Sequence, residues 1–203
     1  MLDCIWDVPG KMLDRSAYHA QRQRESERLT GPIWKLERSQ FFHEPDDDPS
    51  WQAFADGDWD RVLTAFEGDR AAARAEVEGY AKQGSELRRL RIVEFPVTPY
   101  LQWECHWFRI LAEEGTAIRV LDEGKVAAWE RERPLPELVV DEHALYHVTY
   151  DGEWRAVGAR RIDDSHLIRE ATAEIARLWS LGEPFLDYFH REITPLPPPT
   201  QSR

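Results

Sequence analysis

The sequence predicts an α/β protein with a mixed central sheet, flanking helices, a helical N-terminal part and a long C-terminal helix. The main observation is a strand–loop–helix–strand unit from Leu90 to Leu121. Its first strand alternates arginine with apolar residues, and its helix has apolar residues at helical spacing. Two strands joined by a helix of about four turns pair in parallel, so this βαβ unit anchors the predicted sheet.

Composition narrows the function classes. The chain of 203 residues is 42% hydrophobic, includes nine Trp, and has a net charge of −12. This hydrophobic content predicts a folded core, and the negative charge disfavours direct nucleic-acid binding. There is no apolar run of about 18 residues and no N-terminal secretory signal, so we expect no membrane span. Cys4 and Cys105 are far apart, as in a cytoplasmic protein with reduced thiols.

The chain divides into an N-terminal extension, one α/β domain and a proline-rich tail. The extension is expected to be peripheral, with a polar helix from Ser16 to Leu29. The domain begins with a helical subregion and continues as a sheet-containing core. The ranges are 1–31 for the extension, 32–193 for the domain (32–84 and 85–193 for its two parts) and 194–203 for the tail.

The remaining elements follow from periodicity and turn residues. Asp48 and Ser50 are alternative N-caps for the first of two short helices, which break near Gly57. Asp151 and Gly152 predict a hairpin turn. The expected strands are 33–42, 87–95, 116–123, 137–141, 144–151 and 153–163. The expected helices are 51–66, 69–83, 100–114, 165–181 and 184–193.

The helix that starts at Tyr100 is the best candidate for a site. Glu104 lies on its aromatic face, and a carboxylate among aromatic side chains must be protonated or paired. Its candidate partners are Arg88, Arg89, Arg91 and Arg119. Two interpretations stay open: an ion pair that fixes packing, or a polar group that lines an aromatic pocket.

Ligands of parallel α/β units bind beyond the carboxyl ends of the strands. Here these ends meet at the loop 95–99 and after Leu121. The candidate ligand-binding residues are Thr98, Tyr100, Trp103, Glu104, Arg119, Asp141 and His143.

Complete catalytic and metal motifs are absent from the sequence. There is no nucleophile elbow, glycine-rich phosphate loop or HExxH. His143 and His147 are four apart, but on a strand this spacing separates them by roughly 13 Å. We therefore expect no catalytic residue, cofactor or metal.

Several strings carry a resemblance to a known family. They are IWKLERSQFF, PSWQAFADGDWD, RIVEFPVTPYLQWE, LPELVVD and VGARRIDD. From about Trp34 to Ile193 the sequence resembles a family of actinobacterial proteins that carry a domain of unknown function. Members are often encoded near helix-turn-helix regulators, so the resemblance implies a regulatory role with a protein partner.

The order of elements after Leu87 is also similar to half of a phospholipase D-like domain, or to the sensor domain of some helix-turn-helix regulators. Active phospholipase D-like enzymes have a His and a Lys before the string LVVD. Here Pro134 and Pro136 stand in those places, while Asp141 matches the acidic residue. The resemblance therefore implies a degenerate, non-catalytic version.

Two functions from different classes follow. The first is a non-catalytic regulatory or binding module that acts through a protein partner, such as a helix-turn-helix regulator, or through a small ligand. The alternative is an enzyme, phosphodiesterase-like or another hydrolase, that uses Glu104, Asp141 or His143 as acid or base. A dimerising subunit, which would form a homodimer, is the third alternative.

Overall fold

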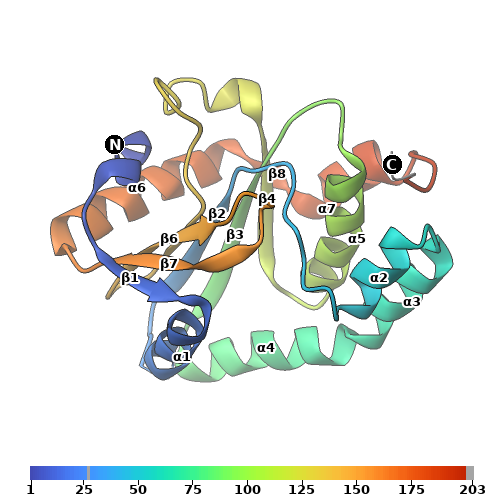
Figure 1. The fold of residues 1–203 in the computed structure, drawn as a ribbon, viewed down its shortest axis with the longest axis horizontal. Helices are drawn as coiled ribbons and strands as arrows, with labels where there is room; N and C mark the ends of the chain where they lie inside the picture. Colours follow the sequence, from blue (N-terminus) through green and yellow to red (C-terminus); the bar gives the residue numbers. More distant parts are fainter. Residues whose placement is uncertain (27, 200–203) are drawn as a thin grey trace.

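The predicted βαβ unit forms part of an eight-stranded mixed sheet in the computed structural model, which describes residues 1–26 and 28–199 (Figure 1). The strand order is β1-β7-β6-β5-β2-β3-β4-β8. Only β2, β3 and β4 run parallel, and the other neighbours are antiparallel. The strands are β1 (Lys11–Asp14), β2 (Pro32–Glu37), β3 (Glu86–Val93), β4 (Ala117–Asp122), β5 (Leu138–Val140), β6 (Leu145–Tyr150), β7 (Ala156–Ile162) and β8 (Glu183–Pro184). The predicted α/β class and mixed sheet are confirmed.

Local sequence explains where the helices begin and end. Asp48 caps α2 by accepting hydrogen bonds from the backbone N–H groups of Ser50 and Trp51. Gly84 ends α4 with a φ of 76°, a left-handed conformation that favours glycine. The helices are α1 (Arg15–Ser26), α2 (Pro49–Ala55), α3 (Trp59–Gly68), α4 (Arg70–Gln83), α5 (Pro99–Glu113), α6 (Ser165–Leu181) and α7 (Phe185–Tyr188). Short 3-10 turns occupy Leu2–Asp7 and Glu123–Lys125, and a π-helical turn covers Phe189–Ile193.

Strand β2 is shorter than expected, because it ends at Glu37 and not near Phe42. After Glu37 the backbone N–H groups form hydrogen bonds with a side chain and not with a neighbouring strand. The N–H groups of Arg38 and Ser39 both donate to Oε1 of Glu137, over 2.9 and 2.6 Å. The chain therefore leaves the sheet with its donors satisfied.

The N-terminal residues contribute an edge strand that was not expected. Strand β1 pairs with β7, and the preceding turn inserts Leu2 and Ile5 into the core, where both are fully buried. Nη2 of Arg160 holds this turn through the carbonyl oxygens of Ile5 (2.9 Å) and Trp6 (2.7 Å). A strand of four residues is too short for its alternation of buried and exposed side chains to be recognised in the sequence.

The polar helix of this N-terminal segment was expected to begin at Ser16. In the structure Asp14 takes the capping role, because its Oδ1 accepts from the N–H of Ala17 over 2.8 Å. Position 27, expected within this helix, and residues 200–203 of the proline-rich tail lie outside the described residues.

The two faces of the sheet are covered differently (Figure 1). Helix α6 packs on one face against apolar strand residues such as Trp34, Leu36 and Leu90. On the other face, α1 packs near β7 and α5 packs near β4, so the middle of the face lies between the two helices. No helix within the described part of the chain is long and apolar enough to cross a membrane.

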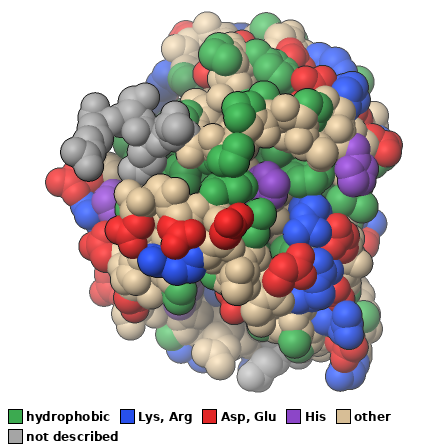
Figure 2. Space-filling view, turned by 90° about the vertical axis from the view of Figure 1, so that its right-hand side faces the viewer, with side chains coloured by type: hydrophobic (Ala, Val, Ile, Leu, Met, Phe, Trp, Pro, Cys, Tyr) green, Lys and Arg blue, Asp and Glu red, His purple; other side chains and the backbone are tan. Residues whose placement is uncertain are grey.

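The side of the molecule that includes α2, α3 and α7 carries both charge signs. Figure 2 shows hydrophobic side chains in its upper and middle part, with acidic and basic side chains interspersed below them. Arg70 pairs with Glu67 (2.8 Å) and Glu113 (2.7 Å), and Arg109 pairs with the same two carboxylates. These contacts tie α3, α4 and α5 together, so the net negative charge of the chain does not form one uniform patch here.

Candidate functional site

A cavity of about 790 Å³ lies on the sheet face between α1 and α5. Its floor includes Lys35 and Glu37 from β2 and Arg89 from β3. These side chains share one face because alternate residues of a strand point to the same side. Trp103, Glu104, Trp107 and Phe108 from α5, residues from α1, and the loop 43–48 contribute the walls and rim.

The floor carries a linked set of charges. Nζ of Lys35 lies 2.7 Å from Oε1 of Glu37, and Nη1 of Arg89 lies 3.1 Å from both oxygens of the same carboxylate. Burial alone would raise the pKa of Glu37, but the charges of Arg89 and Lys35 lower it to about 2. Glu37 is therefore ionised at neutral pH, and two cations plus one anion leave this trio with a net charge of +1.

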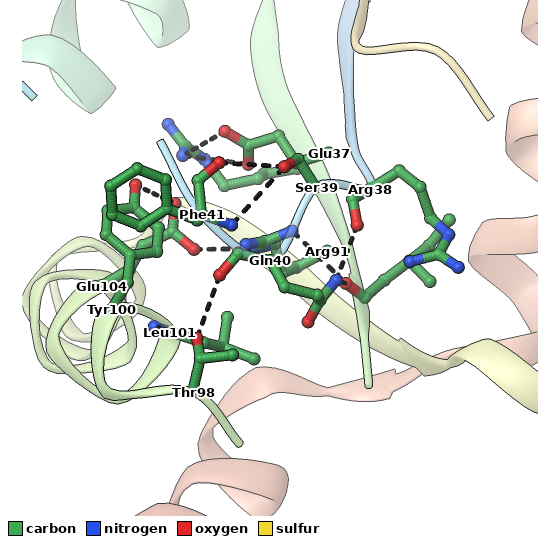
Figure 3. Close-up of polar contacts among 12 residues, drawn as sticks. Glu37, Arg38, Ser39, Gln40, Phe41, Arg91, Thr98, Tyr100, Leu101 and Glu104 are labelled. Carbon is green, nitrogen blue, oxygen red and sulfur yellow. Dashed lines mark hydrogen bonds and ion pairs between the residues drawn. The ribbon is translucent and has the colours of Figure 1, made fainter. Parts of the chain in front are cut away.

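Glu104 is both a paired carboxylate and a cavity residue. Its Oε2 accepts from Nε of Arg91 over 2.8 Å, with Arg91 fully buried and Glu104 only 5% exposed (Figure 3). Burial raises the pKa of Glu104, and the charge of Arg91 opposes that shift. The predicted arginine pairing is confirmed, and the same carboxylate also lines the cavity.

Tyr100 and Thr98 lie behind the cavity wall. The Tyr100 hydroxyl donates to Oε1 of Glu44 over 2.7 Å and lies 3.3 Å from Oε1 of Glu104. Burial, with the charge of Glu104, raises its pKa well above the usual value. Thr98 caps α5: its Oγ1 accepts from the N–H of Leu101 and donates to the carbonyl of Gln40, each over 3.0 Å (Figure 3). Thr98 thus positions the start of the helix.

Trp103 lines the cavity and packs against the rings of Trp51 and Phe66. Its ring lies 5.6 Å from that of Trp51 and 5.5 Å from that of Phe66, measured between ring centres. It is 4% exposed, and its indole N–H is buried without a hydrogen-bond partner among the described residues. The tight aromatic packing makes this wall apolar and rigid.

The other three candidate residues lie elsewhere. Arg119 faces α6, where its Nε donates to the carbonyl of Gly182 over 3.0 Å. Asp141 is buried in the β5–β6 turn, accepts from the N–H groups of His143 (2.8 Å) and Ala144 (3.0 Å), and pairs with Arg22. The His143 side chain is half exposed in the same turn. None of these three residues lines the cavity.

On the floor, Lys35 and Glu37 were not predicted from the sequence, and Arg89 was predicted only as a candidate partner of Glu104. Lys35 and Arg89 are direct partners in the β2–β3 register, although 54 positions separate them along the chain. The signal was present within each strand, because Lys35 and Glu37 share one side of β2 and Arg89 and Arg91 share one side of β3. The alternation of side chains within β2 or within β3 does not show that these two strands are neighbours in the sheet.

A further carboxyl lies at the end of β2. Glu137 accepts the two backbone hydrogen bonds described above through Oε1, while its buried Oε2 has no partner among the described residues. Burial raises its pKa to about 7, against the lowering effect of the Arg91 charge. Within residues 1–26 and 28–199, no three His, Cys, Asp or Glu side chains are grouped so as to hold a metal ion.

Comparison with known proteins identifies a family. A search of curated proteins found no match. A family model described as "Domain of unknown function (DUF6879)" matches residues 20–190, which include the floor of the cavity and all of α5. Because this match spans most of the 203 residues, the chain belongs to the DUF6879 family of domains of unknown function.

Proposed function

We propose that this domain is a non-catalytic binding module that takes up a small organic ligand in the cavity between α1 and α5 and acts on a protein partner in regulation. The observation that carries the proposal is the cavity itself, with its charged floor and aromatic wall. Its volume of about 790 Å³ falls within the range of roughly 300–1,000 Å³ found for small-molecule sites.

The pairing of its charges supports binding over catalysis. Glu37 is held by two cations and Glu104 by Arg91, so neither carboxylate is an unpaired acid or base facing the cavity. Burial also raises the pKa of the Cys105 thiol, which disfavours the reactive thiolate. The hydrolase alternative names Glu104, Asp141 and His143, of which only Glu104 lines the cavity.

The regulatory partner, taken to be a helix-turn-helix regulator, is supported by the resemblance to actinobacterial proteins encoded beside such regulators. The relationship to degenerate phospholipase D-like domains belongs to the same proposal. In its support, Asp141 closes the β5–β6 turn and pairs with Arg22, a structural role for the residue that matches the acidic motif position. A cytoplasmic setting is supported by the two free cysteines, Cys4 and Cys105.

The ligand-binding part is tested with a cavity-filling variant. Ala156 lines the cavity, whereas the next residue on β7, Val157, is 45% exposed and does not line it. A fragment library is screened by saturation-transfer NMR against the wild type, Ala156→Trp and the matched control Val157→Trp. We expect that some fragments bind both the wild type and Val157→Trp but do not bind Ala156→Trp. No binding, or binding that survives Ala156→Trp, would contradict the proposal.

The partner is tested separately by co-expressing the chain with helix-turn-helix regulators of the same organism. Light scattering of the purified sample should show a stable complex of the two chains. Two separate species at micromolar concentration would count against this partner while leaving ligand binding unaffected.

A further inference from the structure

We propose that the ligand of this cavity is a small zwitterion with an aromatic body, such as an aromatic amino acid, bound with its carboxylate toward the floor and its ammonium group toward the rim loop. This inference rests on the proposed function, because it names the class of ligand that the cavity takes.

The floor side of the cavity has an excess of positive charge. The trio of Lys35, Glu37 and Arg89 carries +1, and Arg15 at the start of α1 adds a further cation to the lining. The Lys35 side chain is one-third exposed and has one carboxylate neighbour, so its ammonium can contact a second anion. A ligand carboxylate is therefore attracted to this side.

The rim loop is acidic. The loop between β2 and α2 contributes four acidic residues to the lining, against Arg155 as the nearby cation. Asp47 is exposed and makes no ion pair among the described residues, and Asp46 is paired only with His43 and, at 3.8 Å, with Arg155. The four residues are Glu44, Asp46, Asp47 and Asp48. This loop attracts an ammonium group and repels a multiply charged anion such as a nucleoside triphosphate.

An aromatic wall joins the two sides. Trp103 and Trp107 of α5 line the cavity together with Phe66 of α3, and the rings of Phe66 and Trp107 are stacked with centres 5.6 Å apart. The faces of two other lining rings are already covered, since Arg89 lies over Phe108 and Arg91 over Phe42. Trp103 and Phe66 are buried among other rings, whereas Trp107 is only half-buried, so Trp107 offers the surface that a neutral aromatic body contacts by stacking or by its edge.

The test uses triplets of probes that share one body and differ only in charge. They are L-phenylalanine, 2-phenylethylamine and 3-phenylpropionate, together with the corresponding indole and 4-hydroxyphenyl triplets. Dissociation constants are measured by NMR titration at low salt. We expect each zwitterion to bind at least about five times more tightly than the matching amine or acid. The amine and the acid each lack one of the two charges and so lose one favourable charge contact.

Two variants separate the two ends of the ligand. Lys35→Met removes the floor cation and should weaken zwitterions and acids, leaving the amines unchanged. Asp47→Asn removes an exposed rim charge and should weaken zwitterions and amines, leaving the acids unchanged. Lys82→Met and Asp60→Asn are matched controls on exposed positions that do not line the cavity. Since Asp47 is exposed, its variant is expected to fold even if Lys35→Met does not.

The outcomes distinguish the two proposals. Suppose that library fragments bind the cavity of the wild type and no longer bind Ala156→Trp. The ligand class is then wrong, and the binding function stands, if the amines or acids bind as tightly as the zwitterions. The same conclusion follows if none of the three triplets binds. If no fragment binds the cavity at all, both fail.

Discussion

Arg91 and Glu104 connect the central strand β3 to helix α5 directly beside the cavity, with Nε and Oε2 2.8 Å apart and both side chains nearly free of solvent. This pair sets the position of the aromatic wall relative to the charged floor. Its energetics, and those of the groups around it, lead to four predictions.

The first prediction concerns this ion pair. Arg91→Met leaves the Glu104 carboxylate buried without its partner and should lower the free energy of unfolding by about 3–5 kcal/mol. Arg91→Met combined with Glu104→Leu should recover much of that loss, because no unpaired charge stays buried. Urea denaturation measures both. Arg74→Met, which breaks a surface pair with Glu114, is the control and should cost much less, because solvent screens an exposed pair. Equal losses in Arg91→Met and Arg74→Met would contradict the prediction.

The second prediction concerns pH and Glu137. Its pKa is about 7 in the folded protein against a usual value of 4.5, so the folded state binds the proton more tightly. Its contribution to stability is therefore complete below pH 4.5 and is lost as the pH rises through 7. Relative to Glu137→Gln, the wild type should lose about 3 kcal/mol of unfolding free energy between pH 4.5 and 7.5.

Urea denaturation of both proteins across this pH range provides the comparison. Titrating groups that do not interact with Glu137 contribute equally to the two proteins and cancel in the difference. A difference that stays constant with pH would show that folding does not raise the pKa of Glu137.

The third prediction concerns the N-terminal turn. Leu2 is fully buried against the core under α6, so Leu2→Ala should lower the unfolding free energy by about 2–5 kcal/mol. Met12 on the neighbouring edge strand is 61% exposed, and Met12→Ala should change stability by less than about 0.5 kcal/mol. Chemical denaturation measures both, and a wild-type stability for Leu2→Ala would mean that the turn does not dock in solution.

The fourth prediction concerns Thr98, which caps α5. Thr98→Ala removes the acceptor for the N–H of Leu101 and should cost about 1 kcal/mol, whereas Thr98→Ser keeps the hydroxyl and should cost little. Hydrogen exchange should show faster opening in the first turn of α5 in Thr98→Ala alone. Faster exchange in both variants would indicate that the methyl group, not the hydroxyl, matters at this position, and wild-type exchange in both would contradict the capping role.

The local features of the fold were predictable from the sequence. The periodicity of α5, the Asp48 cap, the break at Gly57 and the stop at Gly84 all depend on residues within about four positions of one another. The expected arginine partner of Glu104 was also found, because β3 and α5 are consecutive and only a short loop separates them. Backbone hydrogen bonding and side-chain spacing therefore determined these elements.

The tertiary structure decided which of these elements meet. Strand β2 lies between β3 and β5, so Lys35 comes to face Arg89 from a distant part of the chain, and the floor of the cavity exists only through that pairing. Asp141 and His143 were grouped with Glu104 by chemistry alone, and the sheet places them in a turn away from the cavity. The alternation within a strand indicates which side is buried, but which strands become neighbours depends on packing across the whole sheet, and local spacing does not specify it.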